Sequence, residues 1–461
     1  MIIGRIGPEG KLPYRAAVFV SAILTAIALG VIISHNPRPT MENHAEDALA
    51  RMAPRAVRND VVVVAIDDES VKKYGPVKSW PRSLLAGGLK RIEDAGAKWV
   101  TIDLPLDERT KTGDESLWRH MANSRNVILG MAYDANRSQT YTPDDIRSLV
   151  FLEKYVIADN ITFGVNTPQF PYYLFEPPVS DFAGSSRGVG VFDRETDTDG
   201  FLRQVRLVYL TKVEYPATAR PLRGKFPQAQ LADGVPAAVP NVALVSALRA
   251  FGLDKNEVKV TAGDTLSLSA NITPEVAIPV DEQGRMLIRY YGPAGSFVHY
   301  SFKDLMDGKL PKDSLKGKNV LLGSTATGES ATDPKATPFG QMPRVEVTAT
   351  ALTTILDRSY YGVYTPRILG MLIVLGLITG LILMLLSGAR AAVAALLLVV
   401  AYLGMTYALY AFSHTMLPIL PGIMTILVPF LLGLLLYIGP MKPTAIESSP
   451  TYVPPPPGVT H

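Results

Sequence analysis

Cysteine is absent from the sequence, and charged residues are few. The absence of cysteine excludes disulfide bonds, thiolate metal sites and cysteine nucleophiles, and it is compatible with a location outside the cytoplasm. Charged residues make up 19% of the chain and apolar residues 48%, a balance typical of a membrane protein. The formal net charge is only +3, which gives no reason to expect a nucleic-acid partner.

Four long apolar segments stand out against this composition. Each contains about 18–23 residues, enough to cross the hydrocarbon core of a bilayer as a helix. They lie at 16–34, 366–387, 390–412 and 416–438. The continuous apolar runs within the last three contain no acidic or basic side chain, which argues against an ion or proton pathway.

Basic residues indicate the orientation of these segments. Arg5 and Arg15 precede the first apolar segment, and Arg390 and Lys442 lie in the short connector and the tail of the last three. Because cytoplasmic flanks are rich in Lys and Arg, we expect four crossings of a bacterial inner membrane with both termini inside. The alternative for the first segment is a cleaved signal peptide that ends near residues 28–30.

These expectations divide the chain around one large extracytoplasmic domain. The parts are a cytoplasmic N-terminus (1–15), a transmembrane helix (16–34), a linker (35–58), an α/β domain (59–365), three transmembrane helices (366–387, 390–412 and 416–438) and a Pro-rich cytoplasmic tail (439–461). Gly376 and Gly380 form a small-xxx-small pair suited to helix contact. Pro418, Pro421 and Pro429 are predicted to bend or break the first half of the last helix.

The stretch 59–103 predicts a β-α-β unit in the large domain. Residues 61–66 are a continuous apolar run that ends in acids, residues 83–96 have apolar side chains at helical spacing, and residues 98–103 form a second strand. We expect the two strands to be parallel neighbours in a mixed sheet with a mainly parallel core. Ligands of open α/β sheets sit beyond the carboxyl ends of the strands, where Asp67 and Asp103 would both stand.

Other patterns in the domain have plain structural explanations. Residues 188–193 and 199–210 predict a hairpin around an Asp-Gly turn. The buried strand 318–325 runs into Gly-Ser-Thr, which favours a tight turn over a backbone anion site. Ser301 and Asp304 approximate a capping box. No nucleophile–base pair and no metal spacing is present, so we expect neither an enzyme nor a cofactor or metal site.

A series of motifs, in order along the chain, resembles the second subtype of the CHASE-type domain, a sensory extracellular domain associated with cyclases and histidine kinases. The motifs span some 300 residues. They lie at 65–70, 80–82, 95–103, 114–117, 126–130, 188, 199–200, 203, 278–281, 284–285, 321–325, 333, 337–338 and 345–347. Three apolar helices follow, as the resemblance implies.

The resemblance implies an integral membrane protein whose sensory or ligand-binding domain lies on the periplasmic or extracellular side. Its apolar helices would contact the lipid bilayer. No kinase or cyclase pattern follows the last apolar segment, so we expect the protein to act through separate membrane or envelope proteins. We also expect it to form a homo-oligomer. The residues predicted to bind a ligand are Asp67, Asp68, Trp80, Arg82, Asp103, Arg203, Ser324 and Asp333. The alternative function is a structural, membrane-anchored subunit of an oligomeric envelope assembly.

Two residues depart from the pattern that the resemblance leads one to expect. Arg344 stands where the family tends to have glycine, and Thr350 where it tends to have asparagine. Both lie on the approach to the first of the three C-terminal helices, so they bear on how a signal would reach the membrane.

Overall fold

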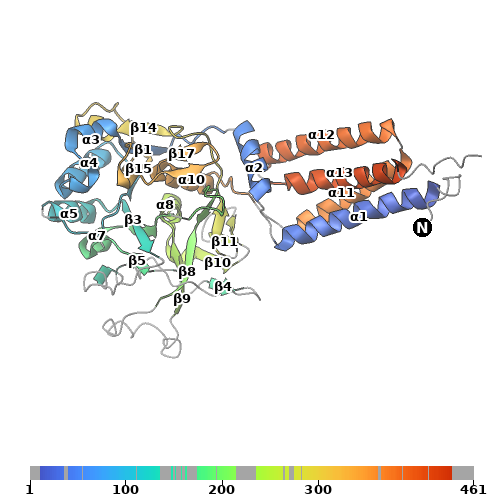
Figure 1. The fold of residues 1–461 in the computed structure, drawn as a ribbon. Coiled ribbons are helices and arrows are strands. Elements are labelled where there is room, and N and C mark those ends of the chain that lie inside the picture. The colour runs from blue at the N-terminus through green and yellow to red at the C-terminus, as the bar shows by residue number, and fades with distance from the viewer. Residues whose placement is uncertain are drawn as a thin grey trace, which may run out of the picture. The chain divides into compact units, whose positions relative to one another are not determined.

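The structure is a computed structural model that describes most of the chain (Figure 1). The described residues are 11–35, 40–53, 55–110, 112–134, 147–148, 151, 157, 161–163, 174–193, 195–213, 235–262, 265–268, 275–281, 283–361, 365–386, 388–413 and 415–438. Arg5 and the Pro-rich tail lie outside them. The chain divides into an α/β unit (43–363 with 409–416) and a helical unit (1–42, 364–408 and 417–461).

A seven-stranded sheet forms the centre of the α/β unit. Its strands are β1 (Val61–Ile66), β2 (Trp99–Asp103), β3 (Val127–Asp134), β5 (Leu174–Glu176), β6 (Gly188–Val191), β14 (Val298–Ser301) and β15 (Asn319–Ser324). The order is β14-β1-β15-β2-β3-β5, with β6 also paired to β3. Every pairing is parallel except that of β3 with β5. The predicted mixed sheet with a parallel core is confirmed.

β15 lies between β1 and β2, so the prediction that these two strands are neighbours was wrong. Val61 pairs with Asn319, and Asn319 pairs with Trp99 on the other side. All six residues of β15 are buried, as expected for an apolar strand with neighbours on both sides. The crossover through the helix from Arg82 to Asp94 therefore skips one strand position, and a strand from far along the chain fills it.

Helices cover both faces of the central sheet. Val62, Val64 and Ile66 of β1 pack in one apolar cluster, and Val61, Val63 and Ala65 pack in another, because successive strand residues point to opposite faces. The first cluster takes in residues of α4 (Arg82–Asp94), α5 (Asp114–Ser124), α7 (Ser180–Ser185) and α9 (Phe302–Met306), near α3 (Asp68–Tyr74) and η1 (Val77–Ser79). The second takes in α8 (Val242–Phe251) and α10 (Arg344–Leu356).

Short strands build smaller sheets beside the central one. They are β12 (Val276–Pro279), β11 (Thr265–Leu268), β10 (Val258–Ala262) and β4 (Ile161–Phe163) in one sheet, and the pairs β7 (Gln204–Arg206) with β13 (Arg285–Leu287), β8 (Val208–Val213) with β9 (Val235–Pro240), and β16 (Lys335–Thr337) with β17 (Gly340–Met342). The 3₁₀ helices η4 (Lys255–Glu257) and η5 (Ser330–Thr332) also lie in this unit.

Two local predictions in this unit were wrong. The hairpin predicted from 188 to 210 does not form, because β6 joins β3 in the central sheet and β7 pairs with β13. The Asp-Gly turn itself is present, with Gly200 at φ 84°, but it does not join paired strands. Ser301 precedes α9 without a side-chain cap hydrogen bond, so the capping box is absent there.

The helical unit contains α1 (Lys11–His35), α11 (Thr365–Leu385), α12 (Ala389–Phe412) and α13 (Ile419–Ile438), and it also takes in the first residues of α2 (Thr40–Met52). Among the described residues, two segments are long and apolar enough to cross a membrane, Ile368–Leu385 and Ala389–Phe412. The apolar parts of α1 and α13, Ala16–Ile32 and Ile419–Leu435, are shorter. Large apolar side chains such as Leu24, Leu396 and Leu435 are exposed on this unit.

Gly376 and Gly380 let α11 approach α1 closely. A Cβ atom on Gly376 would lie 2.9 Å from the carbonyl oxygen of Ala22 and 2.9 Å from Ala26 Cβ, and one on Gly380 would lie 2.9 Å from Phe19 Cδ2. The small-xxx-small pair thus serves packing within the chain, one of the two uses that the sequence left open.

The start of α13 corrects the prediction for its prolines. The helix begins at Ile419, so Pro418 precedes it and Pro421 lies in its first turn, where a missing N–H group does little harm. Only Pro429 lies inside the helix. Glu42 accepts hydrogen bonds from the backbone N–H groups of Ile419 (2.5 Å) and Leu420 (2.9 Å). A carboxylate at this end also suits the helix dipole.

We expect Gly376→Leu to destabilise the helical unit by about 1–3 kcal/mol, because the added side chain overlaps α1. Gly370→Leu is the matched control, since no atom lies within 4 Å of a Cβ at that position on the same helix. Thermal unfolding of the full chain in detergent measures the difference. Equal melting temperatures for the two variants would contradict the α1–α11 packing.

Candidate functional site

The carboxyl edge of the central sheet gathers several of the predicted ligand-binding residues. Ile66, the last residue of β1, pairs with Ser324 of β15, and Gly323 pairs with Asp103 of β2. Asp67 follows β1 directly. Three adjacent strands therefore end in polar side chains at one edge, as the β-α-β pattern predicts for Asp67 and Asp103.

Asp103 is buried in an ion pair with Arg344, the first residue of α10. Arg344 Nε donates to Asp103 Oδ1 at 2.7 Å, and Nη2 donates to the Asp103 carbonyl oxygen at 3.1 Å. Thr348 Oγ1 donates to Asp103 Oδ2 at 2.7 Å. Asp103 is 1% exposed and Arg344 5%. Removing one partner of such a pair costs about 3–5 kcal/mol.

Arg344 also joins Asp333 and Phe192 to this group. Its Nη1 donates to Asp333 Oδ2 at 3.1 Å, and its guanidinium lies 4.0 Å from the centre of the Phe192 ring. Burial opposes the charge of Arg344, but the Asp103 and Asp333 carboxylates leave its pKa raised. For Asp333, burial is likewise outweighed by Lys335 and Arg344, so its pKa is lowered. The two predicted residues Asp103 and Asp333 thus belong to one structural network.

Asp67, Asp68 and Ser324 make hydrogen bonds within the same edge. Asp67 is the N-cap of α3, and its Oδ1 accepts from the backbone N–H (2.9 Å) and the hydroxyl (2.6 Å) of Ser70. Asp68 Oδ1 accepts from the backbone N–H of Thr327 at 2.7 Å. Ser324 Oγ lies 2.7 Å from Thr332 Oγ1. These contacts tie the loop after β15 to α3 and occupy the groups predicted to bind a ligand.

Trp80 and Arg82 lie apart from the Asp103 network. Trp80 is 1% exposed, packs against Phe302 in a tilted arrangement with ring centres 5.0 Å apart, and donates from Nε1 to the Gly75 carbonyl oxygen at 2.7 Å. Arg82 Nε lies 4.0 Å from Asp114 Oδ1. Burial lowers the pKa of Arg82. Both side chains contribute to the packing of α4 rather than to a shared site.

Arg203 is the centre of a second buried network. Its Nε and Nη2 donate to the two carboxylate oxygens of Asp47, each at 2.8 Å, and its Nη1 donates to Asp197 (3.0 Å) and Asp199 (2.9 Å). The Arg203 and Asp47 side chains are each 3% exposed. Asp47 lies on α2, in the segment predicted to be a linker, so Arg203 holds the linker helix to the α/β unit. This bidentate geometry is the strongest form of the pair.

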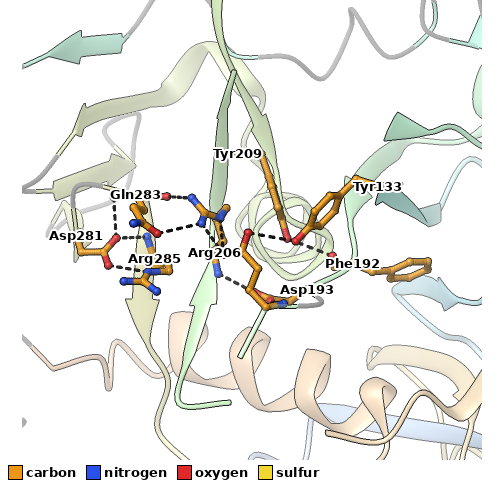
Figure 2. Close-up of polar contacts among 9 residues, drawn as sticks. Tyr133, Phe192, Asp193, Arg206, Tyr209, Asp281, Gln283 and Arg285 are labelled. Atoms are coloured by element: carbon orange, nitrogen blue, oxygen red, sulfur yellow. Dashed lines mark hydrogen bonds and ion pairs between the residues drawn. The ribbon is translucent and has the colours of Figure 1, made fainter. Parts of the chain in front are cut away.

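A third network begins with Asp193, which follows β6 (Figure 2). Asp193 Oδ2 accepts from the backbone N–H of Arg206 at 2.7 Å, and Oδ1 accepts from the backbone N–H of Glu195 at 3.0 Å. The Arg206 guanidinium donates to Glu195 and to the Gln283 carbonyl oxygen. Tyr133 Oη donates to Glu195 Oε1 at 3.2 Å. β6 and the β7–β13 pair are thereby locked together.

Burial raises the pKa of Asp193 to about 7. The lost hydration outweighs the backbone N–H group of Arg206, which favours the carboxylate. The nearby negative charge of Glu195 adds to the shift. Asp193 therefore changes its charge near neutral pH in the folded protein.

The acids of the three networks share one kind of environment. Each acid is held by arginines or by N–H and O–H donors, and among the described residues no group of three His, Asp or Glu side chains could hold a metal ion. Asp47, Asp193 and Glu195 were missed at the level of the sequence, because their partners lie 156, 13 and 11 residues away in the chain.

The raised pKa of Asp193 predicts a pH dependence of stability. In the unfolded chain the carboxyl ionises near pH 4, so between pH 4 and 7 the folded protein binds the proton more tightly, and stability falls as the pH rises through this window. We expect Asp193→Asn to reduce this pH-dependent loss of stability by an amount on the order of 2–4 kcal/mol.

Melting temperatures of the full chain at pH 5 and pH 8 measure the effect. Asp94→Asn, at an exposed position on α4, is the control, and it should keep the wild-type difference. If Asp193→Asn kept that difference as well, Asp193 would not be the group that titrates.

Comparison with known protein families gives one match. The CHASE2 domain model matches residues 21–388, which covers residues 43–363 of the α/β unit, the helices α2 and α11, and α1 from residue 21 onward. Searches of curated proteins and of solved structures each found no match. CHASE2 domains are extracellular sensory domains. The protein therefore belongs to the CHASE2 domain family.

Proposed function

We propose that the protein is an integral membrane sensor of the bacterial inner membrane, with its α/β unit on the periplasmic or extracellular side. In this proposal α1, α11, α12 and α13 each cross the bilayer, and the protein acts as a homo-oligomer through separate envelope proteins. The family is one of extracellular sensory domains, and that supports the side of the membrane on which the α/β unit is proposed to lie.

Length and surface support the four crossings. The helices α1, α11, α12 and α13 contain 25, 21, 24 and 20 residues, and about 20 residues span a bilayer core. Their exposed side chains include many large apolar ones, which in water would be an aggregation hazard. Lipid is the solvent that such a surface suits.

The observation that carries the sensory proposal is the buried ion pair between Arg203 and Asp47. The α2 helix follows α1 in the chain. Both carboxylate oxygens of its residue Asp47 accept hydrogen bonds from Arg203. Five residues earlier, Glu42 accepts from the first N–H groups of α13. One continuous helix thus carries both contacts, so a change in the α/β unit that altered the Arg203 network would act on α2.

The segment 409–416 packs within the α/β unit. This segment includes the end of α12, and it belongs to the α/β unit. Tyr410 stacks on Tyr361 with ring centres 4.8 Å apart, and the Arg289 guanidinium lies 5.0–5.2 Å from both rings. Arg55 Nη2 donates to the Ala411 carbonyl oxygen at 2.6 Å. Desolvated cation–π contacts of this kind contribute about 2 kcal/mol.

A ligand would switch such a protein only by binding one state more tightly than another. Shifting a two-state equilibrium from 1:99 to 99:1 takes about 5.5 kcal/mol. Removing one partner of a buried ion pair costs about 3–5 kcal/mol. The Arg203–Asp47 contact is therefore comparable in energy to such a shift, and in this proposal α2 is the element that moves.

Single-cysteine labelling tests the topology, and the cysteine-free sequence means that each variant carries one thiol. We expect Lys312→Cys in the α/β unit and Ser413→Cys after α12 to react with a membrane-impermeant maleimide on cells with a permeable outer envelope. Arg390→Cys should react only after the inner membrane is opened. All three positions are exposed. Protection of Lys312→Cys until that step would overturn the proposed orientation.

A further inference from the structure

A large cavity lies at the amino edge of the central sheet, opposite the edge where the predicted site residues gather. Its volume is about 910 Å³, within the usual range for small-molecule sites of roughly 300–1,000 Å³. Its wall includes Trp99, where β2 begins, Arg125, which precedes β3, and Arg187, which precedes β6. The end of α8 and the turn after it complete the wall.

Positive charge dominates the lining of this amino-edge cavity. Four cationic residues line it, Arg125, Arg187, Arg249 and Lys255, against one acid, Asp254. Cationic groups in a concavity repel one another, and the protein walls focus their field. The whole chain has a net charge of only +3, so this local excess is not a reflection of the composition.

The one acid is already engaged by one of the four cations. Arg249 forms an ion pair with Asp254, and its Nε donates to the Arg187 carbonyl oxygen at 2.9 Å. Arg249 therefore braces the wall between α8 and β6. Within the described residues, the Arg125 and Arg187 guanidinium groups form no ion pair, and both side chains are exposed. Their charge is available to a ligand.

The backbone holds these two arginines in place. Arg125 caps the end of α5 in the left-handed conformation, with φ 58° and its N–H donating to the Met121 carbonyl oxygen. Arg187 N–H donates to the Val127 carbonyl oxygen at 2.8 Å, directly before β6. The lining also includes the apolar side chains of Trp99, Val245 and Leu248. Two arginines in the wall of one cavity match an anion with more than one acidic group, and the apolar side chains suit a ligand with a carbon skeleton.

We propose that the amino-edge cavity binds a small organic anion that carries two or more carboxylate or phosphate groups. Arg125 and Arg187 hold the acidic groups, Arg249 and Asp254 keep the wall in position, and Trp99 contacts the body of the ligand. The biological role of this ligand rests on the proposed sensory function, but the binding itself does not, because binding requires no signalling.

Equilibrium binding to the purified full-length chain in detergent tests this site. The probes are citrate, succinate, inorganic phosphate and pyrophosphate, titrated by calorimetry at constant ionic strength. We expect at least one polyanion to bind saturably, and inorganic phosphate to bind more weakly than the organic probe. In Arg125→Asn/Arg187→Gln binding should weaken about tenfold or more, since each lost charge-assisted hydrogen bond is worth about a factor of ten.

A matched control separates a site from general attraction of anions. Lys312→Gln/Lys316→Gln removes two exposed positive charges elsewhere on the α/β unit, and it should bind the probe as the wild type does. Asn is tolerated at the left-handed position of Arg125, and Arg187→Gln alone, which leaves that position unchanged, should show part of the loss. Absence of binding by every probe, or equal affinity in the Arg125→Asn/Arg187→Gln and Lys312→Gln/Lys316→Gln variants, would overturn the proposal. Either result would leave the topology and the role of α2 untouched.

Discussion

The proposed sensory function depends on the bidentate ion pair between Arg203 and Asp47. Arg203 is 3% exposed and is also held by Asp197 and Asp199, so its position is determined from the α/β side alone. Asp47 lies on α2, and Glu42 of the same helix accepts hydrogen bonds from the first residues of α13. A buried charge that loses its partner is strongly destabilising, so the pair strongly favours the bound arrangement of α2.

The two edges of the central sheet carry different side chains. The carboxyl edge, where open α/β sheets usually bind ligands, is closed by Arg344 between Asp103 and Asp333. Phe192 lies under Arg344, and Asp193 beside it begins the next network. The amino edge has the cavity and the uncompensated arginines instead. Arg187 in the cavity wall directly precedes β6, which the Asp193 network follows in the chain.

Local sequence patterns predicted the elements that local physics decides. The apolar run of β1, the amphipathic helix α4 and the acids that follow the strands are present as expected, and the β-α-β pattern predicted that Asp67 and Asp103 lie at the same edge. The patterns could not reveal that β15 separates β1 from β2, since strand order depends on packing between distant segments. They also could not pair Asp47 with Arg203 or form a cavity from four separate stretches of chain. Arg344 was noticed only as a departure from the family, and its partner Asp103 explains it.

Hydrogen exchange in α2 tests the central claim most directly. In the full-length protein, Asp47→Ala should speed amide exchange across residues 43–52 by at least about tenfold, because the helix loses the ion pair that holds it. Met52→Ala, at a position on the same helix that is 68% exposed, should leave the exchange at the wild-type rate. If α2 stayed equally protected in Asp47→Ala, Arg203 would not hold the helix, and the proposed route from the α/β unit to the membrane would be wrong.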